Sequence, residues 1–80
     1  MATTQVPLSH LNIGNQATIV RIGGERLLRR KMLTMGIITG EQITLTARAP
    51  LGDPLEFQVK GYRLSLRSHE AEQVLVEVAQ

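Results

Sequence analysis

The residues that could perform catalysis are few and widely spaced in this sequence of 80 residues. His10 and His69 have no acidic residue at ligand spacing apart from Glu70 and Glu72. No Ser-His-Asp pattern and no H-E-x-x-H motif is present. We therefore predict that the protein is not an enzyme and that it has no catalytic residue.

Metal and nucleotide sites are equally poorly supported. Cysteine is absent, and the two His and three Met residues are not arranged as pairs. The triplet His69, Glu70 and Glu72 could hold a divalent cation weakly, but a solvated helical turn explains it more simply. Residues 22–25 contain two glycines but neither phosphate-binding motif, so they predict a turn into a helix. We expect no metal ligands and no cofactor.

Composition indicates one folded domain over residues 1–80. Hydrophobic residues make up 42% of the chain and charged residues 20%, which is the balance of a globular protein. The lack of cysteine suits a reducing compartment. Residues 1–6 show no signal-peptide pattern, and no apolar run approaches the ~18 residues of a membrane span. We expect a cytoplasmic protein, neither secreted nor embedded.

Most of the expected elements are short strands. The alternation of apolar and polar residues predicts strands near 42–48, 55–59 and 62–66. A first strand is predicted at 16–22, which is rich in β-branched residues, and a last strand at 74–78. The strands at 55–59 and 62–66 should form a tight hairpin, in which Phe57 and Tyr62 point inward. A single helical turn carries Leu8 and Leu11, which should plug one end of the fold, and a second turn should be capped by Ser68.

One longer helix is predicted over residues 25–35. Its apolar stripe comprises Leu27, Leu28, Met32 and Met35, and Gly36 should end it. Strands this short bury their apolar faces best in a small barrel. The predicted fold is therefore mostly β, an SH3-like barrel of about five antiparallel strands with one α-helix after the first strand.

The helix carries a basic cluster. Arg26, Arg29, Arg30 and Lys31 fall within six positions and lie away from the apolar stripe. The cluster is either the solvated face of an amphipathic helix or a docking surface, and arginine favours specific pairing. Leu33 lies outside the stripe and is either a core residue or an apolar anchor beside the charges.

Three stretches of the chain resemble the FeoA family. Residues 28–40 are similar to its basic helix and glycine turn, residues 49–54 to its proline-glycine loop, and residues 64–67 to its "xLxLR" strand. The opening at residues 8–14 matches as well. Thr39 departs from the pattern because the family commonly has proline there, which should make this turn less rigid.

This resemblance implies an SH3-like accessory protein of bacterial ferrous iron uptake that binds FeoB, a membrane permease whose cytosolic part includes a GTP-binding domain. We expect contact with the membrane only through the permease, and weak self-association is compatible with the sequence. The helix at 25–35 and the loop at 50–54 are expected to form one recognition surface. The expected partner-binding residues are Arg26, Arg29, Arg30, Leu33, Met35, Gly36, Pro50, Leu51, Gly52, Asp53 and Pro54.

Two other functions remain open. The same barrel is similar to the C-terminal domain of DtxR-type metal-dependent repressors, where it serves regulation within the molecule. A nucleic-acid-binding barrel is the other alternative, although the chain has only one Phe and one Tyr for base stacking. We expect no nucleic-acid partner.

Overall fold

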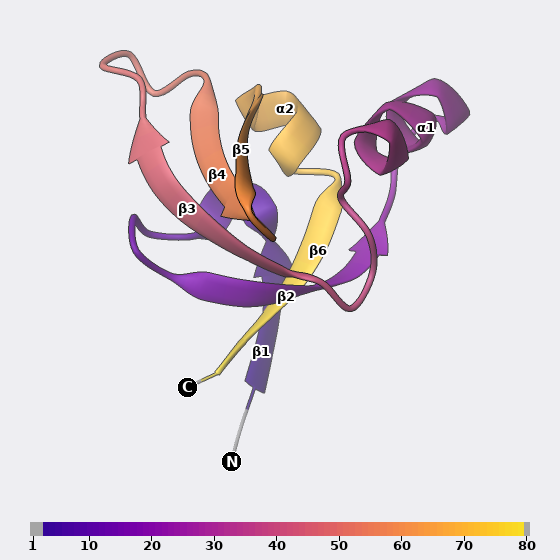
Figure 1. The fold of residues 1–80 in the computed structure, drawn as a ribbon, viewed down its shortest axis with the longest axis horizontal. Coiled ribbons are helices and arrows are strands. Elements are labelled where there is room, and N and C mark those ends of the chain that lie inside the picture. The colour runs from indigo at the N-terminus through magenta and orange to yellow at the C-terminus, as the bar shows by residue number, and fades with distance from the viewer. Residues whose placement is uncertain (1–2, 80) are drawn as a thin grey trace.

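The centre of the protein is one antiparallel sheet, seen in a computed structural model that describes residues 3–79 (Figure 1). Within these residues the six strands are β1 (Thr3–Pro7), β2 (Gln16–Ile22), β3 (Gln42–Arg48), β4 (Leu55–Val59), β5 (Tyr62–Leu66) and β6 (Val74–Ala79). Their order across the sheet is β1-β6-β2-β3-β4-β5. The register shifts within the β2–β6 and β3–β4 pairs, and such bulges let a sheet bend. The predicted mostly-β fold is confirmed.

Three helical segments complete the fold. They are η1 (Leu8–His10), a single 3₁₀ turn; α1 (Arg26–Thr34), between β2 and β3; and α2 (Ser68–Ala71), between β5 and β6. Each was expected at about this place. Figure 1 shows α1 at the upper right, at the periphery of the sheet.

Strand β1 was not predicted, so α1 follows the second strand instead of the first. β1 pairs along its whole length with β6, from Thr3 opposite Ala79 to Pro7 opposite Leu75. It has only one large apolar residue, Val6, and its exposure pattern alternates weakly. Its extended conformation therefore depends on the neighbouring strand more than on its own composition.

The core is formed by the inward side chains of the sheet together with residues from the helical turns. Leu8 and Leu11 are both buried, as expected for residues that close one end of the fold. Phe57 is fully buried, but Tyr62 is 43% exposed, so its predicted inward orientation is wrong. Tyr62 is the first residue of β5, and its hydroxyl donates a hydrogen bond to the Met35 carbonyl at 2.6 Å.

Candidate partner-binding surface

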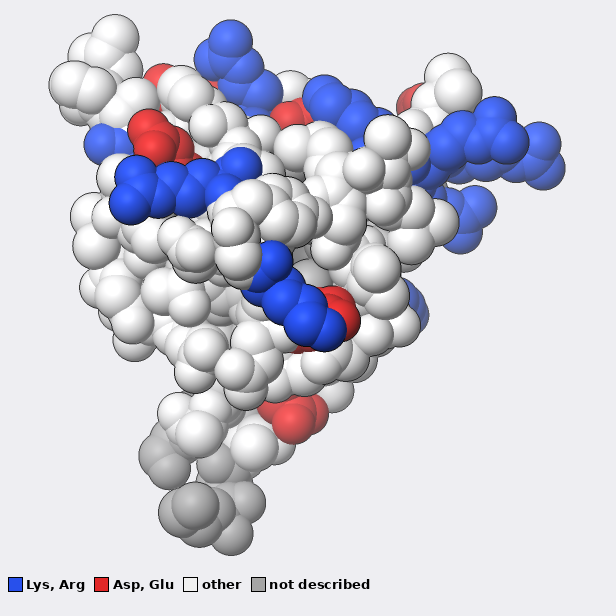
Figure 2. Space-filling model, in the orientation of Figure 1, with Lys and Arg blue, Asp and Glu red and all other residues white. Residues whose placement is uncertain are grey.

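The two faces of α1 differ sharply in burial. Met32 is fully buried, while Leu28 and Met35 are half-buried against the core. Arg26, Arg29, Arg30 and Leu33 project away from the sheet, and together they line a shallow hollow. We call these four residues the outer face of α1. Figure 2 shows basic side chains standing clear of the body at the upper right, over α1.

Leu27 corrects the predicted apolar stripe. It is 74% exposed, although helical spacing assigned it to the core with Leu28 and Met32. At 100° per residue, Leu27 points about 100° away from Leu28. The buried stripe is narrower than predicted, because α1 contacts the sheet along one side only.

Lys31 differs from the three arginines. Its ammonium nitrogen Nζ lies 2.5 Å from Oε2 of Glu70 in α2, so its charge is met within the chain. Arg26, Arg29 and Arg30 form no ion pair with any residue of the part that the structure describes. The outer face is therefore a surface with three unmatched positive charges.

Gly36 fixes the end of α1 against the sheet. Its φ of 91° is a left-handed conformation that suits glycine. A Cβ at this position would overlap the Tyr62 hydroxyl oxygen, which is hydrogen-bonded to the carbonyl of the preceding residue. The turn after the helix, including Met35 and Gly36, is thus held by a specific contact with β5.

The loop between β3 and β4 is closed on itself. The Ala49 N–H donates to the Pro54 carbonyl at 3.1 Å, and the Gly52 N–H donates to the Ala49 carbonyl at 2.8 Å. These bonds place Leu51 at the tip, where it is 96% exposed. The loop at 50–54 is ordered as predicted, and it presents one apolar side chain.

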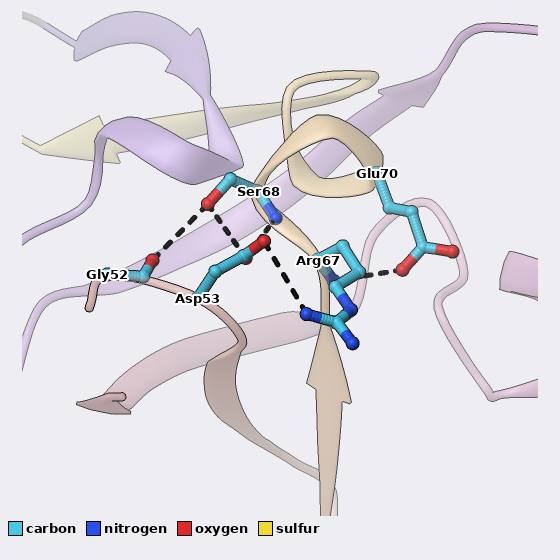
Figure 3. Close-up of polar contacts among 5 residues, drawn as sticks. All are labelled: Gly52, Asp53, Arg67, Ser68 and Glu70. Atoms are coloured by element: carbon cyan, nitrogen blue, oxygen red, sulfur yellow. Dashed lines mark hydrogen bonds and ion pairs between the residues drawn. The ribbon is translucent and has the colours of Figure 1, made fainter. Parts of the chain in front are cut away.

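Asp53 joins this loop to α2 (Figure 3). Its carboxylate Oδ1 accepts the Ser68 backbone N–H at 2.7 Å and the Ser68 hydroxyl at 3.0 Å. Oδ2 lies 3.8 Å from Nη1 of Arg67. The bond from the Ser68 N–H, which is the largest effect, together with the Ser68 hydroxyl and the positive charge of Arg67 lowers the pKa of Asp53. A residue of the loop thus satisfies the start of α2.

The predicted cap of α2 is wrong. Arg67 occupies the N-cap position and Ser68 is the first helical residue. Ser68 cannot cap the helix from inside it, and Asp53 meets its N–H from 15 positions earlier. Sequence spacing alone carries no signal for a capping residue that comes from a distant loop.

Glu70 is also placed differently from the prediction, which described it as part of a solvated turn. It is 7% exposed, and it accepts the Arg67 N–H at 2.9 Å as well as the Lys31 ammonium. These two donors, the Lys31 ammonium foremost, lower the pKa of the Glu70 carboxyl group. Its carboxylate is committed to structural contacts. Residues 3–79 contain no group of three or more His, Asp or Glu placed to hold a metal ion.

Helix α1 and the loop at 50–54 lie at different ends of one side of the molecule. Figure 1 shows the loop at the upper left, α1 at the upper right and α2 between them. Asp53 contacts the start of α2, and Lys31 contacts Glu70 in the same helix. That the helix and the loop act as one recognition surface stays a prediction.

A second hollow lies beside the end of α1, and sequence reasoning missed it. It is lined by Gly36, Ile38, Glu41, Val59, Lys60 and Tyr62. Ile38 is 47% exposed there. The apolar character of Ile38 in a turn was the one available signal.

No helix among the described residues is long and apolar enough to cross a membrane.

Comparison with known proteins gives consistent matches. The family model described as FeoA domain matches residues 6–78. A relative from Porphyromonas gingivalis, an Fe(2+) transport protein A/Fe(2+) transporter FeoB fusion protein, is 41% identical over 71 residues. These residues are 89% of this chain but 8% of the fusion protein, so the chain spans less than a tenth of that relative.

Solved structures agree with the computed fold. A FeoA-like protein from Clostridium acetobutylicum is 38% identical with a TM-score of 0.87, covering 100% of this chain and 92% of the other. FeoA from Stenotrophomonas maltophilia, complexed with zinc and described as an SH3 domain protein, is 29% identical with a TM-score of 0.75, covering 95% and 89%. A manganese-dependent transcriptional repressor has a TM-score of 0.87 at 18% identity, covers 99% of this chain and 44% of the other, and shares the fold alone. With a family model matching nearly its whole length and the same SH3-like barrel, the chain belongs to the FeoA domain family.

Proposed function

We propose that this protein is a non-catalytic, cytoplasmic accessory domain of ferrous iron uptake that binds the cytosolic region of a FeoB-type permease. The observation that carries the proposal is the outer face of α1, with three arginines that have no ionic partner in the described chain. The fusion protein of Porphyromonas gingivalis supports the choice of partner, because it joins the two kinds of protein in one polypeptide. Such a tether gives two domains a high effective concentration.

The proposed contact surface has two parts. One is α1 with the turn at Met35 and Gly36, and the other is the loop from Pro50 to Pro54. Leu33 and Leu51 are its exposed apolar side chains, at 57% and 96%. In the loop, the contacts of Gly52 and Asp53 with Ser68 hold Leu51 in position. Residues 1–80 act in this proposal as one FeoA-like domain, and binding changes the permease's iron transport or its GTP turnover.

Binding to the purified cytosolic region of the permease from the same organism tests this proposal. We expect saturable binding in a calorimetric titration, together with a changed rate of GTP hydrolysis by that region. The matched control is the same titration with buffer in place of the permease's cytosolic region, which gives the heat of dilution of the chain. Absence of heat and of any change in GTP turnover at the highest attainable concentration would contradict the proposal.

A further inference from the structure

We infer that the outer face of α1 binds an acidic segment of its partner, with carboxylates on Arg26, Arg29 and Arg30 and one aliphatic side chain seated against Leu33. The inference rests on the proposed function and specifies the chemistry of the permease surface that this site fits. It concerns a protein segment, as opposed to lipid or nucleic acid.

The shape of the face supports an apolar anchor. Arg26, Arg29, Arg30 and Leu33 line one hollow on the helix. Leu33 is 57% exposed within it, and the aliphatic stems of arginine side chains can complete an apolar wall while their guanidinium groups stay in water. An aliphatic side chain in the hollow would be surrounded by positive charge, which is the usual arrangement of anchor and rim at a protein interface.

The charges support carboxylates as the ligands. Lys31 on the same helix already pairs with a carboxylate, at 2.5 Å from Glu70. The arginines of the outer face have no such partner within residues 3–79, and Glu25, the residue that precedes α1, forms no ion pair with them. Guanidinium groups bind carboxylates through two parallel hydrogen bonds, which gives geometric specificity. An acidic segment is therefore the complementary partner.

A membrane fits these observations less well. Three arginines near an anionic leaflet would give only a marginal attachment to a membrane. Interfacial helices insert one continuous apolar face. Here Leu27 and Leu33 lie on either side of the Arg26 and Arg30 positions, and Leu27 is not part of the hollow. Single-stranded nucleic acid would need stacking aromatics, which α1 lacks.

Two double variants with the same change in net charge test the inference. Arg29→Glu with Arg30→Glu reverses the outer face, and Arg21→Glu with Arg63→Glu reverses two exposed arginines on β2 and β5. Affinity for the permease's cytosolic region is measured for each at low and high salt. We expect the first variant to bind about tenfold more weakly or worse, equivalent to about 1.4 kcal/mol, and to lose most of the salt dependence. The second should stay within about twofold of wild type.

A pair of single variants tests the apolar anchor. Leu33→Ala should weaken binding severalfold, whereas Leu27→Ala, on the same helix but outside the hollow, should not. Circular dichroism and thermal unfolding establish that all four variants are folded. An unfolded Arg29→Glu/Arg30→Glu variant would be replaced by Arg29→Gln/Arg30→Gln, for which the same order of affinities is expected.

The outcomes separate this inference from the proposed function. If wild type binds the permease region and both double variants bind it as tightly as wild type does, the outer face is not the site. The inference is then overturned, while the proposed function stands. If wild type does not bind at all, both fail. If the Arg29→Glu/Arg30→Glu variant loses binding only to vesicles of anionic phosphatidylglycerol, the occupant is a lipid surface and the inference is also overturned.

Discussion

The outer face of α1 and the polar network around α2 both carry charged side chains, but they differ in how those charges are met. In the network, the charges of Asp53, Arg67 and Glu70 all have partners within the chain (Figure 3). On the outer face none of the three arginines has one among the described residues. Charged residues of one chain can therefore serve different purposes, which only their contacts distinguish.

Lys31 marks the boundary between these two regions. It belongs to the basic cluster by sequence, yet it pairs with Glu70 and links α1 to α2. Arg29 and Arg30, which precede it in the sequence, line the hollow of the outer face, and Lys31 does not. The network is thus linked to the helix by one ion pair, and the outer face is left available for a partner.

Replacing Gly36 with alanine should destabilise the end of α1 most. A left-handed φ costs a non-glycine residue about 1–2 kcal/mol, and displacing Tyr62 should cost its hydrogen bond to Met35, about 1 kcal/mol more. We expect a loss of about 3 kcal/mol in the free energy of unfolding, measured by urea denaturation.

Gly52→Ala is the matched control for this substitution. Gly52 has a φ of 88°, but a Cβ there would meet nothing within 4 Å. Its cost should be only the backbone strain of about 1–2 kcal/mol. Equal losses for the two variants would show that the contact between Gly36 and Tyr62 does not hold the helix end.

Glu70→Ala should separate α1 from the network. It removes the acceptor of the Arg67 N–H and of the Lys31 ammonium, and hydrogen bonds to charged groups contribute about 1.5–3 kcal/mol. Because Lys31 is 56% exposed, water replaces part of that interaction, and we expect a loss of about 1–2 kcal/mol. Unchanged stability would mean that the ion pair does not position α1.

Acid should remove the contribution of the network's two carboxylates to stability. The pKa values of Asp53 and Glu70 lie below their ordinary values of 3.8 and 4.5 in the folded protein. Both carboxylates therefore stabilise the fold fully above those ordinary values, and this contribution is lost as the pH falls through the lowered pKa values. Unfolding measured from pH 6 to pH 2 should show stability falling below about pH 4.5. Glu70→Gln and Asp53→Asn should each flatten that fall, and a fall of unchanged steepness would assign it to other carboxylates.

The smallest change in stability is expected on the outer face. Leu33→Ala and the Arg29→Glu/Arg30→Glu variant should each stay within about 0.5 kcal/mol of wild type, as exposed substitutions usually do. Thermal unfolding measures this. A larger loss would indicate that these side chains support the fold, and that the face is not free for binding.

Much of the fold could be predicted because apolar alternation records burial directly. The strand at 42–48 and the hairpin at 55–66 follow that pattern, and their inward residues are buried except Ala47, which is half-buried, and Tyr62, which is exposed. Strand β1 could not be predicted, because it depends on pairing with β6, which is remote in sequence. The same reason explains Ser68, whose N–H is bonded by Asp53 from a distant loop.

The candidate site was predictable in part. The exposure of Arg26, Arg29 and Arg30 follows from helical spacing, and the structure agrees. Leu27 could not be placed, because spacing gives the direction of each side chain but not the width of the surface that the helix contacts. The different fate of Lys31 depends on Glu70, 39 positions away, and only the folded chain brings them together.

The most direct test of the account is an NMR titration of the isotope-labelled chain with the permease's cytosolic region. The account predicts amide shift changes concentrated on residues 26–36, with a second group at residues 50–54 around Leu51. Shift changes confined to the opposite side of the sheet, or none at a partner concentration that saturates binding in calorimetry, would contradict the claim that α1 is the docking element.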